Sequence, residues 1–168
     1  KPIIALLHPE TIRKRDTFRD AKLMLECIKL YNRHTIIIYP CTDNGYEKII
    51  NAIKCFKNVN LFNVYKNIDS QDFIKILSIS SLLIGNSSSG IREASYLGIP
   101  SVNIGTRQEG RLRGQNVIDA DYDASSIVSA VNQCFFDEKF KAECEVTDNP
   151  YYLGDAGKKI ADVFNNRV

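Results

Sequence analysis

Short apolar runs alternate with amphipathic stretches along this 168-residue chain. The apolar runs predict strands at residues 2–7, 35–39, 60–64, 81–84, 101–104 and 116–119. Apolar residues three and four apart predict helices at residues 16–31, around 49–56, from Ser70, after Gly90, at 124–135 and at 155–166. In the last helix we expect Ile160, Ala161 and Phe164 to face inward. This order predicts an α/β fold: a doubly wound, Rossmann-like parallel sheet of about six strands with helices on both faces.

Composition narrows the class of protein further. A hydrophobic content of 44% suffices for one well-filled domain, which we place at residues 1–168. No apolar run reaches the roughly 18 residues of a membrane span, and no signal peptide precedes the first strand, so we expect a cytoplasmic protein without a membrane partner. The five cysteines are scattered, which predicts reduced thiols and no metal site. A net charge of +2 with mixed signs argues against nucleic acid as a partner.

The first residues predict that a longer natural protein has been cut. Lys1 and Pro2 lead directly into the first strand without an initiator methionine, and the one methionine, Met24, lies within a predicted helix. We therefore expect an N-terminal portion to be missing from this chain.

A polar turn at residues 85–90 is the strongest candidate for a binding site. It joins a buried strand to a predicted helix that carries Glu93. A helix N-terminus offers unpaired amides and a positive dipole end, so Asn86, Ser87 and Ser88 are candidates for binding a phosphate. Glu93 lies off the apolar stripe of that helix, at a place where it can bond ribose hydroxyls. The alternative is that the serines only cap the helix.

Two other loops are expected at the same edge of the sheet. His8 ends the first strand, and a loop at residues 105–114 holds Arg107, Arg111 and Arg113 among three glycines. Arginine forks match phosphate oxygens, although a solvated basic loop is the alternative. His34 is expected in a surface turn, and His8 has no cysteine beside it in sequence, which argues against a zinc site or a Cys/His pair.

The segment GNSSSGIREASYLGIPSVNIGTRQEGRLRGQNVID, residues 85–119, resembles the hydrolysing UDP-N-acetylglucosamine 2-epimerases of sialic-acid-type sugar biosynthesis. The resemblance extends from His8-Pro9 through the final helix. Non-hydrolysing epimerases carry a Ser-Gly-Gly turn instead, so the run after Val102 favours the hydrolysing branch. Where vertebrate-type relatives have Asn after Tyr-Pro, this chain has Cys41. Related epimerases of legionaminic-acid synthesis use another nucleotide or a diacetamido sugar, so the sugar stays open.

The resemblance implies a two-domain fold of the glycosyltransferase-B type, with this chain as its C-terminal, nucleotide-holding half. It implies that Ser87 and Ser88 bind phosphate, that Glu93 binds the ribose, and that Arg107 and His8 lie on the diphosphate or sugar side. His8 is then the candidate catalytic residue, and Asn86 and Arg113 complete the candidate substrate-binding set. It also implies elimination of UDP to a 2-acetamido glycal, then hydration to N-acetylmannosamine, with the acid and base carboxylates on the N-terminal half. No cofactor is expected, and the full-length protein is expected to be a homo-oligomer.

Two alternatives stay open at this point. One is the C-terminal domain of another nucleotide-sugar glycosyltransferase, which also places a Glu on the ribose. The other is a non-catalytic nucleotide-sugar-binding domain.

Overall fold

The computed structural model describes residues 1–11, 15–152 and 154–165. Its strands are β1 (Ile3–Leu6), β2 (Thr35–Ile38), β3 (Phe62–Tyr65), β4 (Leu82–Gly85), β5 (Ser101–Ile104) and β6 (Val117–Ala120). Its helices are α1 (Thr17–Lys29), α2 (Tyr46–Lys54), α3 (Ser70–Ser78), the 3-10 turn η1 (Ser88–Gly90), α4 (Glu93–Tyr96), α5 (Ala124–Phe136), α6 (Glu138–Glu145) and α7 (Ala156–Asn165). The predicted strands and the long predicted helices are present, with ends shifted by a few residues.

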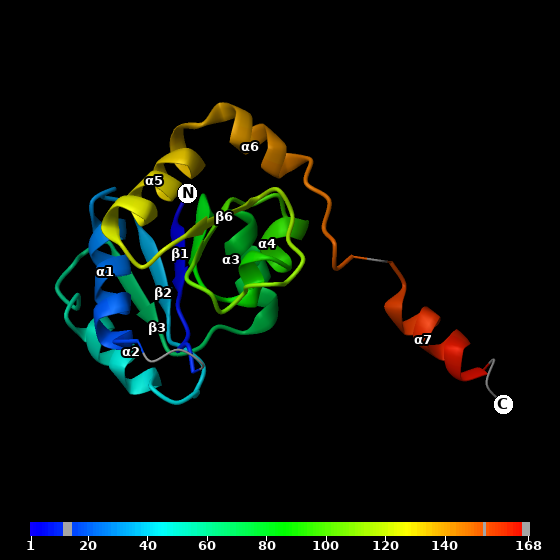
Figure 1. Cartoon of the computed structure of the whole chain (residues 1–168), viewed down its shortest axis with the longest axis horizontal. Coiled ribbons are helices and arrows are strands. Elements are labelled where there is room, and N and C mark those ends of the chain that lie inside the picture. Colours follow the sequence, from blue (N-terminus) through cyan, green and yellow to red (C-terminus); the bar gives the residue numbers. More distant parts are fainter. Residues whose placement is uncertain (12–14, 153, 166–168) are drawn as a thin grey trace.

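The six strands form one parallel sheet in the order β3-β2-β1-β4-β5-β6 (Figure 1). The order reverses between β1 and β4, as it does in doubly wound sheets. The predicted fold class, a doubly wound Rossmann-like domain, is therefore confirmed.

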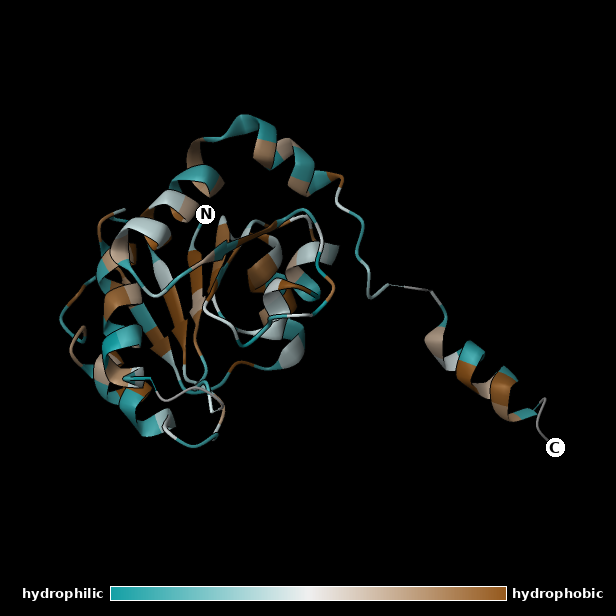
Figure 2. Ribbon diagram, viewed as in Figure 1, coloured by the Kyte–Doolittle hydropathy of each residue, from teal (hydrophilic) through white to brown (hydrophobic). Residues whose placement is uncertain are grey.

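Alternate residues along the strands supply two cores. In β1, Ile3 and Ala5 pack with α1, α2, α5 and α6, whereas Ile4 and Leu6 belong to a smaller core on the other face. Leu77 of α3 and Ala94 of α4 fill that second core. The central strands are apolar on both sides, as expected for a sheet covered by helices (Figure 2).

The helix predicted after Gly90 differs from expectation. It consists of the 3-10 turn η1, a break at Ile91 and Arg92, and the four-residue helix α4. The chain is held close to the sheet here, because a Cβ on Gly90 would lie 2.4 Å from the Ser101 hydroxyl oxygen. So short a helix has little dipole, and the helix-dipole argument for an anion site fails.

The C-terminal segment corrects a second expectation. Helix α6 had not been predicted, and it packs Phe140 and Cys144 into the larger core. Helix α7 forms as predicted but lies away from the domain (Figure 1), with Ile160 59% and Phe164 70% exposed and Ala161 also exposed. The inward-facing assignment was therefore wrong, since an apolar stripe does not reveal what covers it. Asn166, its predicted last residue, lies outside the described residues.

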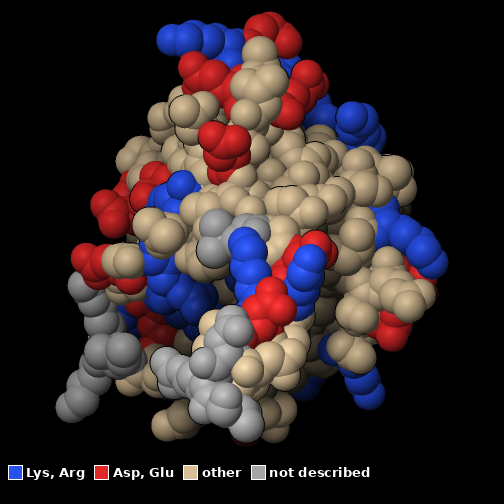
Figure 3. Space-filling view, turned by 90° about the vertical axis from the view of Figure 1, so that its right-hand side faces the viewer, with Lys and Arg blue, Asp and Glu red and all other residues tan. Residues whose placement is uncertain are grey.

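The surface carries no extended patch of one charge on the side seen in Figure 3, where acidic and basic side chains are interspersed. Within the described residues, no helix combines the length and apolar character needed to cross a membrane.

Candidate functional site

The candidate site lies where the strand order reverses, at the carboxyl ends of β1 and β4. Gly85 ends β4 with φ of +141°, and a Cβ there would lie 2.0 Å from the main-chain oxygen of Leu6. Only glycine fits, because both the backbone conformation and the close contact exclude a side chain. The two strand ends therefore lie in direct contact, and the loops that follow them share one crevice.

Asn86 joins these two loops. Its Oδ1 accepts a hydrogen bond from the His8 main-chain N–H at 2.7 Å, and its Nδ2 donates to the His8 carbonyl oxygen at 2.9 Å. The side chain is fully buried, and the Asn86 carbonyl oxygen accepts a bond from Gln108 Nε2 at 2.7 Å. The structure thus places this predicted substrate-binding residue in contact with protein groups, where it positions His8.

His8 is held as a neutral ring. Its Nδ1 accepts a hydrogen bond from the Cys41 main-chain N–H at 3.0 Å, so the ring proton lies on Nε2. Burial, and then the nearby Arg107 charge, lower the pKa of His8 to about 4, against a smaller opposite effect of Asp43. At neutral pH, His8 therefore offers a hydrogen-bond donor and no charge.

The serine turn lies beside His8. Ser87 is in an extended conformation, and its Oγ accepts a bond from the Ser89 N–H at 3.3 Å, so its hydroxyl caps η1. Ser88 is half-buried, and Ser89 lines the same hollow as His8. On α4, Glu93 Oε2 is buried and has no hydrogen-bond partner in the described part of the chain. A buried acceptor in this state is costly unless a ligand satisfies it.

The three arginines of the 105–114 loop have different surroundings. Arg107 reaches the crevice, where its Nη1 donates to the Asn86 carbonyl oxygen at 3.4 Å and its Nη2 lies 3.7 Å from Asp43 Oδ2. Arg113, a predicted substrate contact, instead pairs with Asp119 and donates to the Gln108 carbonyl oxygen at 2.8 Å. Arg111 donates to Gln108 Oε1 at 2.8 Å. Two of the guanidinium groups therefore hold the loop's own fold, whereas Arg107 bonds Asn86 and acts on His8 through its charge.

Glu10 fixes this loop over the crevice. Its Oε1 accepts bonds from the Thr106 N–H at 3.0 Å and the Tyr122 hydroxyl at 2.9 Å, while Oε2 accepts from the Thr106 hydroxyl at 3.1 Å. Burial and then the Glu10 charge raise the pKa of Tyr122. Gly105, with φ of +76°, makes room, because a Cβ there would lie 2.3 Å from Glu10 Oε1.

Sequence reasoning missed Glu10, Gln108, Asp43 and Tyr122. Glu10 follows the predicted loop residue His8 closely and could have been suspected on that ground. Gln108 lies in the loop predicted at residues 105–114, but its bond to Asn86 comes from a segment distant in sequence. The same holds for the contact of Asp43 with Arg107 and for that of Tyr122 with Glu10. His34, expected in a surface turn, is exposed.

Two hollows flank these side chains. One, of about 540 Å³, is lined by His8, Cys41, Ser89 and side chains from the ends of β2 and the start of α3, including Tyr39 and Phe73. The other, of about 450 Å³, is lined by Glu10, Thr106, Arg107 and Asp43, among others. His8 thus lines a partly apolar hollow, and Arg107 lines a charged one.

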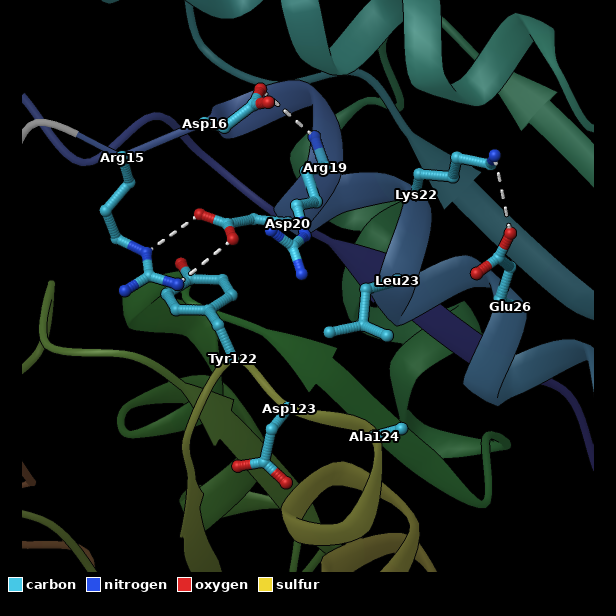
Figure 4. A pocket seen from close by; sticks show the side chains of 10 residues that line it. All are labelled: Arg15, Asp16, Arg19, Asp20, Lys22, Leu23, Glu26, Tyr122, Asp123 and Ala124. Carbon is cyan, nitrogen blue, oxygen red and sulfur yellow. Dashed lines mark hydrogen bonds and ion pairs between the residues drawn. The ribbon is translucent and has the colours of Figure 1, made fainter.

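A larger hollow of about 750 Å³ lies elsewhere, between α1 and the start of α5 (Figure 4). Its charges are largely paired within the protein, with Arg15 Nε 2.9 Å from Asp20 and Lys22 3.7 Å from Glu26. Arg15 also stacks on Tyr122 at 4.2 Å from the ring centroid. None of the predicted site residues lines it, so size alone does not identify the site.

The fold and this crevice define a doubly wound α/β domain with a candidate ligand site at the strand-order reversal. The family model described as UDP-N-acetylglucosamine 2-epimerase matches residues 1–165, and the chain belongs to that family.

Several relatives agree with this assignment. A UDP-N-acetylglucosamine 2-epimerase of Neisseria meningitidis is 31% identical over 97% of this chain and 42% of its own length. The polysialic acid biosynthesis protein P7 of Escherichia coli is 34% identical over 91% of this chain and 39% of its own. A hydrolysing GDP/UDP-N,N'-diacetylbacillosamine 2-epimerase of Campylobacter jejuni is 34% identical over 68% and 30%. The chain thus spans about two-fifths or less of these curated relatives.

Solved structures support the fold. The crystal structure of a UDP-GlcNAc 2-epimerase from Neisseria meningitidis bound to UDP-GlcNAc superposes with a TM-score of 0.81 at 18% identity, over 99% of this chain and 45% of that one. A heptosyltransferase of Escherichia coli, WaaC with ADP, reaches a TM-score of 0.53 at 13% identity over 82% of this chain and 44% of that one. At these identities the likeness concerns the fold alone.

Proposed function

We propose that this chain is the C-terminal, UDP-holding half of a hydrolysing UDP-N-acetylglucosamine 2-epimerase. The full enzyme would eliminate UDP from UDP-GlcNAc through a 2-acetamido glycal and add water, giving N-acetylmannosamine and UDP. The observation that carries this proposal is that Asn86, in the serine turn, bonds both His8 and Arg107 in a chain of this family.

The role of these residues would be to stabilise the leaving group. As the bond to the sugar breaks, negative charge grows on the departing diphosphate. The Nε2–H of His8 and the guanidinium of Arg107 are donors already held in place, by Cys41 and Asn86 respectively. Hydrogen-bond donors that are oriented before the reaction lower its barrier, because they bind the negative charge of the transition state more strongly than the neutral ground-state atom. With its pKa lowered to about 4, His8 would donate a hydrogen bond without itself being charged.

The nucleoside would occupy the hollow next to His8. Glu93 offers a buried carboxylate oxygen without a partner among the described residues, which suits the ribose hydroxyls. The hollow at the ends of β1 and β2 has apolar lining from Ile38 and Phe73, which suits a base. Ser87 and Ser88 directly precede Ser89, which lines this hollow, and would meet the diphosphate.

The hydrolysing reaction is favoured by the relatives from Campylobacter jejuni and Legionella pneumophila, both named as hydrolysing diacetylbacillosamine epimerases. The name of the polysialic acid relative favours a place in sialic-acid-type synthesis. A cytoplasmic location is part of the proposal. Among the residues that the structure describes, none is positioned as an acid and base pair for carbon chemistry, so the isolated chain should release no N-acetylmannosamine. Product formation by this chain alone would contradict the division of labour proposed here.

The full-length protein is proposed to be a homo-oligomer that includes the missing N-terminal half. Light scattering of the full-length protein should give a mass above that of one chain. A strict monomer would refute this part.

Titration calorimetry with UDP, uridine and inorganic diphosphate tests the site. Glu93→Ala should weaken UDP roughly tenfold or more and leave diphosphate nearly unchanged, because the bonds lost go to ribose. Arg107→Ala should weaken both ligands and flatten their salt dependence. Glu47→Ala and Arg19→Ala, at exposed positions on α2 and α1, are the matched controls. Uridine binding as tight as UDP binding would refute the phosphate site.

The fold itself is shared with a sugar transferase, so products must decide between reactions. Released N-acetylmannosamine from the full-length enzyme supports the epimerase. Transfer of the sugar to an acceptor supports the glycosyltransferase alternative, and binding without turnover supports a non-catalytic domain.

A further inference from the structure

An ion pair crosses the candidate crevice. Asp43 lies in the segment after β2, and Arg107 lies in the segment after β5, while β1 and β4 run between them. Arg107 Nη2 is 3.7 Å from Asp43 Oδ2. The pair therefore spans the place where His8 and Asn86 lie, which is the place proposed for the diphosphate.

The pair is loose compared with others in the same protein. Arg15 binds Asp20 through two bonds of 2.9 and 3.1 Å, whereas Arg107 makes one long contact to Asp43 and a hydrogen bond of 3.4 Å to Asn86. The Arg107 side chain is 30% exposed. That of Asp43 is 47% exposed. A guanidinium has five N–H donors, so Arg107 can still bind an anion of higher charge, such as a phosphate.

Asp43 is attached to the same segment that orients His8. Its Oδ2 accepts a bond from the Cys41 thiol at 3.0 Å, and the Cys41 main-chain N–H donates to His8 Nδ1. The carboxylate is therefore held near the donors that would serve a phosphate. A phosphate placed between these groups would meet a like charge, and Arg107 would have to leave Asp43 to bind it fully.

We propose that Asp43 occupies the place of a ligand phosphate in the unliganded protein, and that Arg107 exchanges Asp43 for the diphosphate of a nucleoside diphosphate. This inference rests on the proposed function. Asp43 is then a positioning and specificity residue: it keeps Arg107 near the crevice, lowers the affinity for the diphosphate, and helps expel UDP after the reaction by taking Arg107 back.

The test is Asp43→Asn in the 168-residue chain, with Asp162→Asn on exposed α7 as a control of equal charge change. Exposed ion pairs contribute up to about 1 kcal/mol, so Asp43→Asn should bind UDP and diphosphate about two- to fivefold more tightly. Uridine affinity should not change. In 1 M salt the gain should shrink, because screening weakens both the pair and the repulsion.

A double-mutant cycle identifies the partner. In an Arg107→Gln background, Asp43→Asn should give a clearly smaller gain, since no guanidinium remains to be released. An equal gain in both backgrounds, an unchanged affinity or a weaker affinity for UDP would overturn the exchange while leaving the proposed function intact. If the unmodified chain bound neither UDP nor diphosphate, the proposed function would fail and the exchange with it.

Discussion

Asn86 is the residue whose replacement should most affect the crevice. In Asn86→Ala, the main-chain N–H and carbonyl of His8 lose partners at 2.7 and 2.9 Å, inside a site where the Asn86 side chain has no exposure. Each buried group left unpaired costs about 1–3 kcal/mol, so the free energy of unfolding should fall by about 2–6 kcal/mol. Urea denaturation with linear extrapolation measures this loss.

A second readout separates positioning from general stability. With two histidines in the chain, the ring nitrogens of His8 can be followed by NMR against those of exposed His34. In Asn86→Ala the bond from Cys41 to His8 Nδ1 should weaken, and the two neutral tautomers should become more equally populated. Asn116→Ala is the matched control, because that amide is also fully buried and donates to Ile99 and Gly90. It should destabilise the fold but leave the His8 ring unchanged. A loss below about 1 kcal/mol in Asn86→Ala, or unchanged His8 nitrogens, would refute the reasoning.

Three further predictions follow from the same contacts. Because the pKa of His8 is lowered to about 4, the unfolded chain binds a proton there before the folded chain does. The free energy of unfolding should therefore fall by at most about 2 kcal/mol from about pH 7 to about pH 5. In His8→Gln the contribution of His8 to this fall should be absent, as measured by urea denaturation at the two pH values. Gly85→Ala should cost more than about 3 kcal/mol, since its Cβ would meet a main-chain oxygen at 2.0 Å. Gly110→Ala, also at positive φ but with nothing within 4 Å, should cost clearly less, and equal losses would contradict the steric argument. Ending the chain after Tyr152 should change the free energy of unfolding by less than about 0.5 kcal/mol, because no α7 residue is buried; a larger loss by urea denaturation would show that α7 packs on the domain.

The sheet could be predicted because its signals are local. Runs such as Ile36-Ile37-Ile38 have one stable environment in a soluble domain, a strand covered on both faces, and the helices between them show their buried face by spacing. The topology predicts that the loops at the carboxyl ends of the strands lie together, and the composition of the turn at residues 85–90 singles it out among them. The structure places Ser89 of this turn and His8 in one hollow.

The remaining features depend on partners distant in sequence. Arg107 enters the crevice because it bonds Asn86, and Arg113 holds the loop because it pairs with Asp119. The sequence of the loop alone does not distinguish these two roles. Helix α4 is short because the backbone at Gly90 must pass close to Ser101. The sequence of α7 shows an apolar stripe, but such a stripe does not identify the surface against which the helix packs.

The central position of β1 has a consequence for the order in which the protein folds. β1 comes first in the chain, and one of its two neighbours, β4, begins only at Leu82. The bonds between His8 and Asn86 close a loop of 78 residues, so their formation waits for a slow, long-range encounter. Until then one edge of β1 stays unpaired, and apolar side chains such as Ile3 and Ile4, which are buried in the folded protein, stay exposed beside it. An unpaired apolar strand edge can pair with another chain and so cause aggregation. The crevice is therefore completed at the same step that joins the two halves of the sheet, and slow or failed joining leaves the chain without a site as well as without a complete sheet.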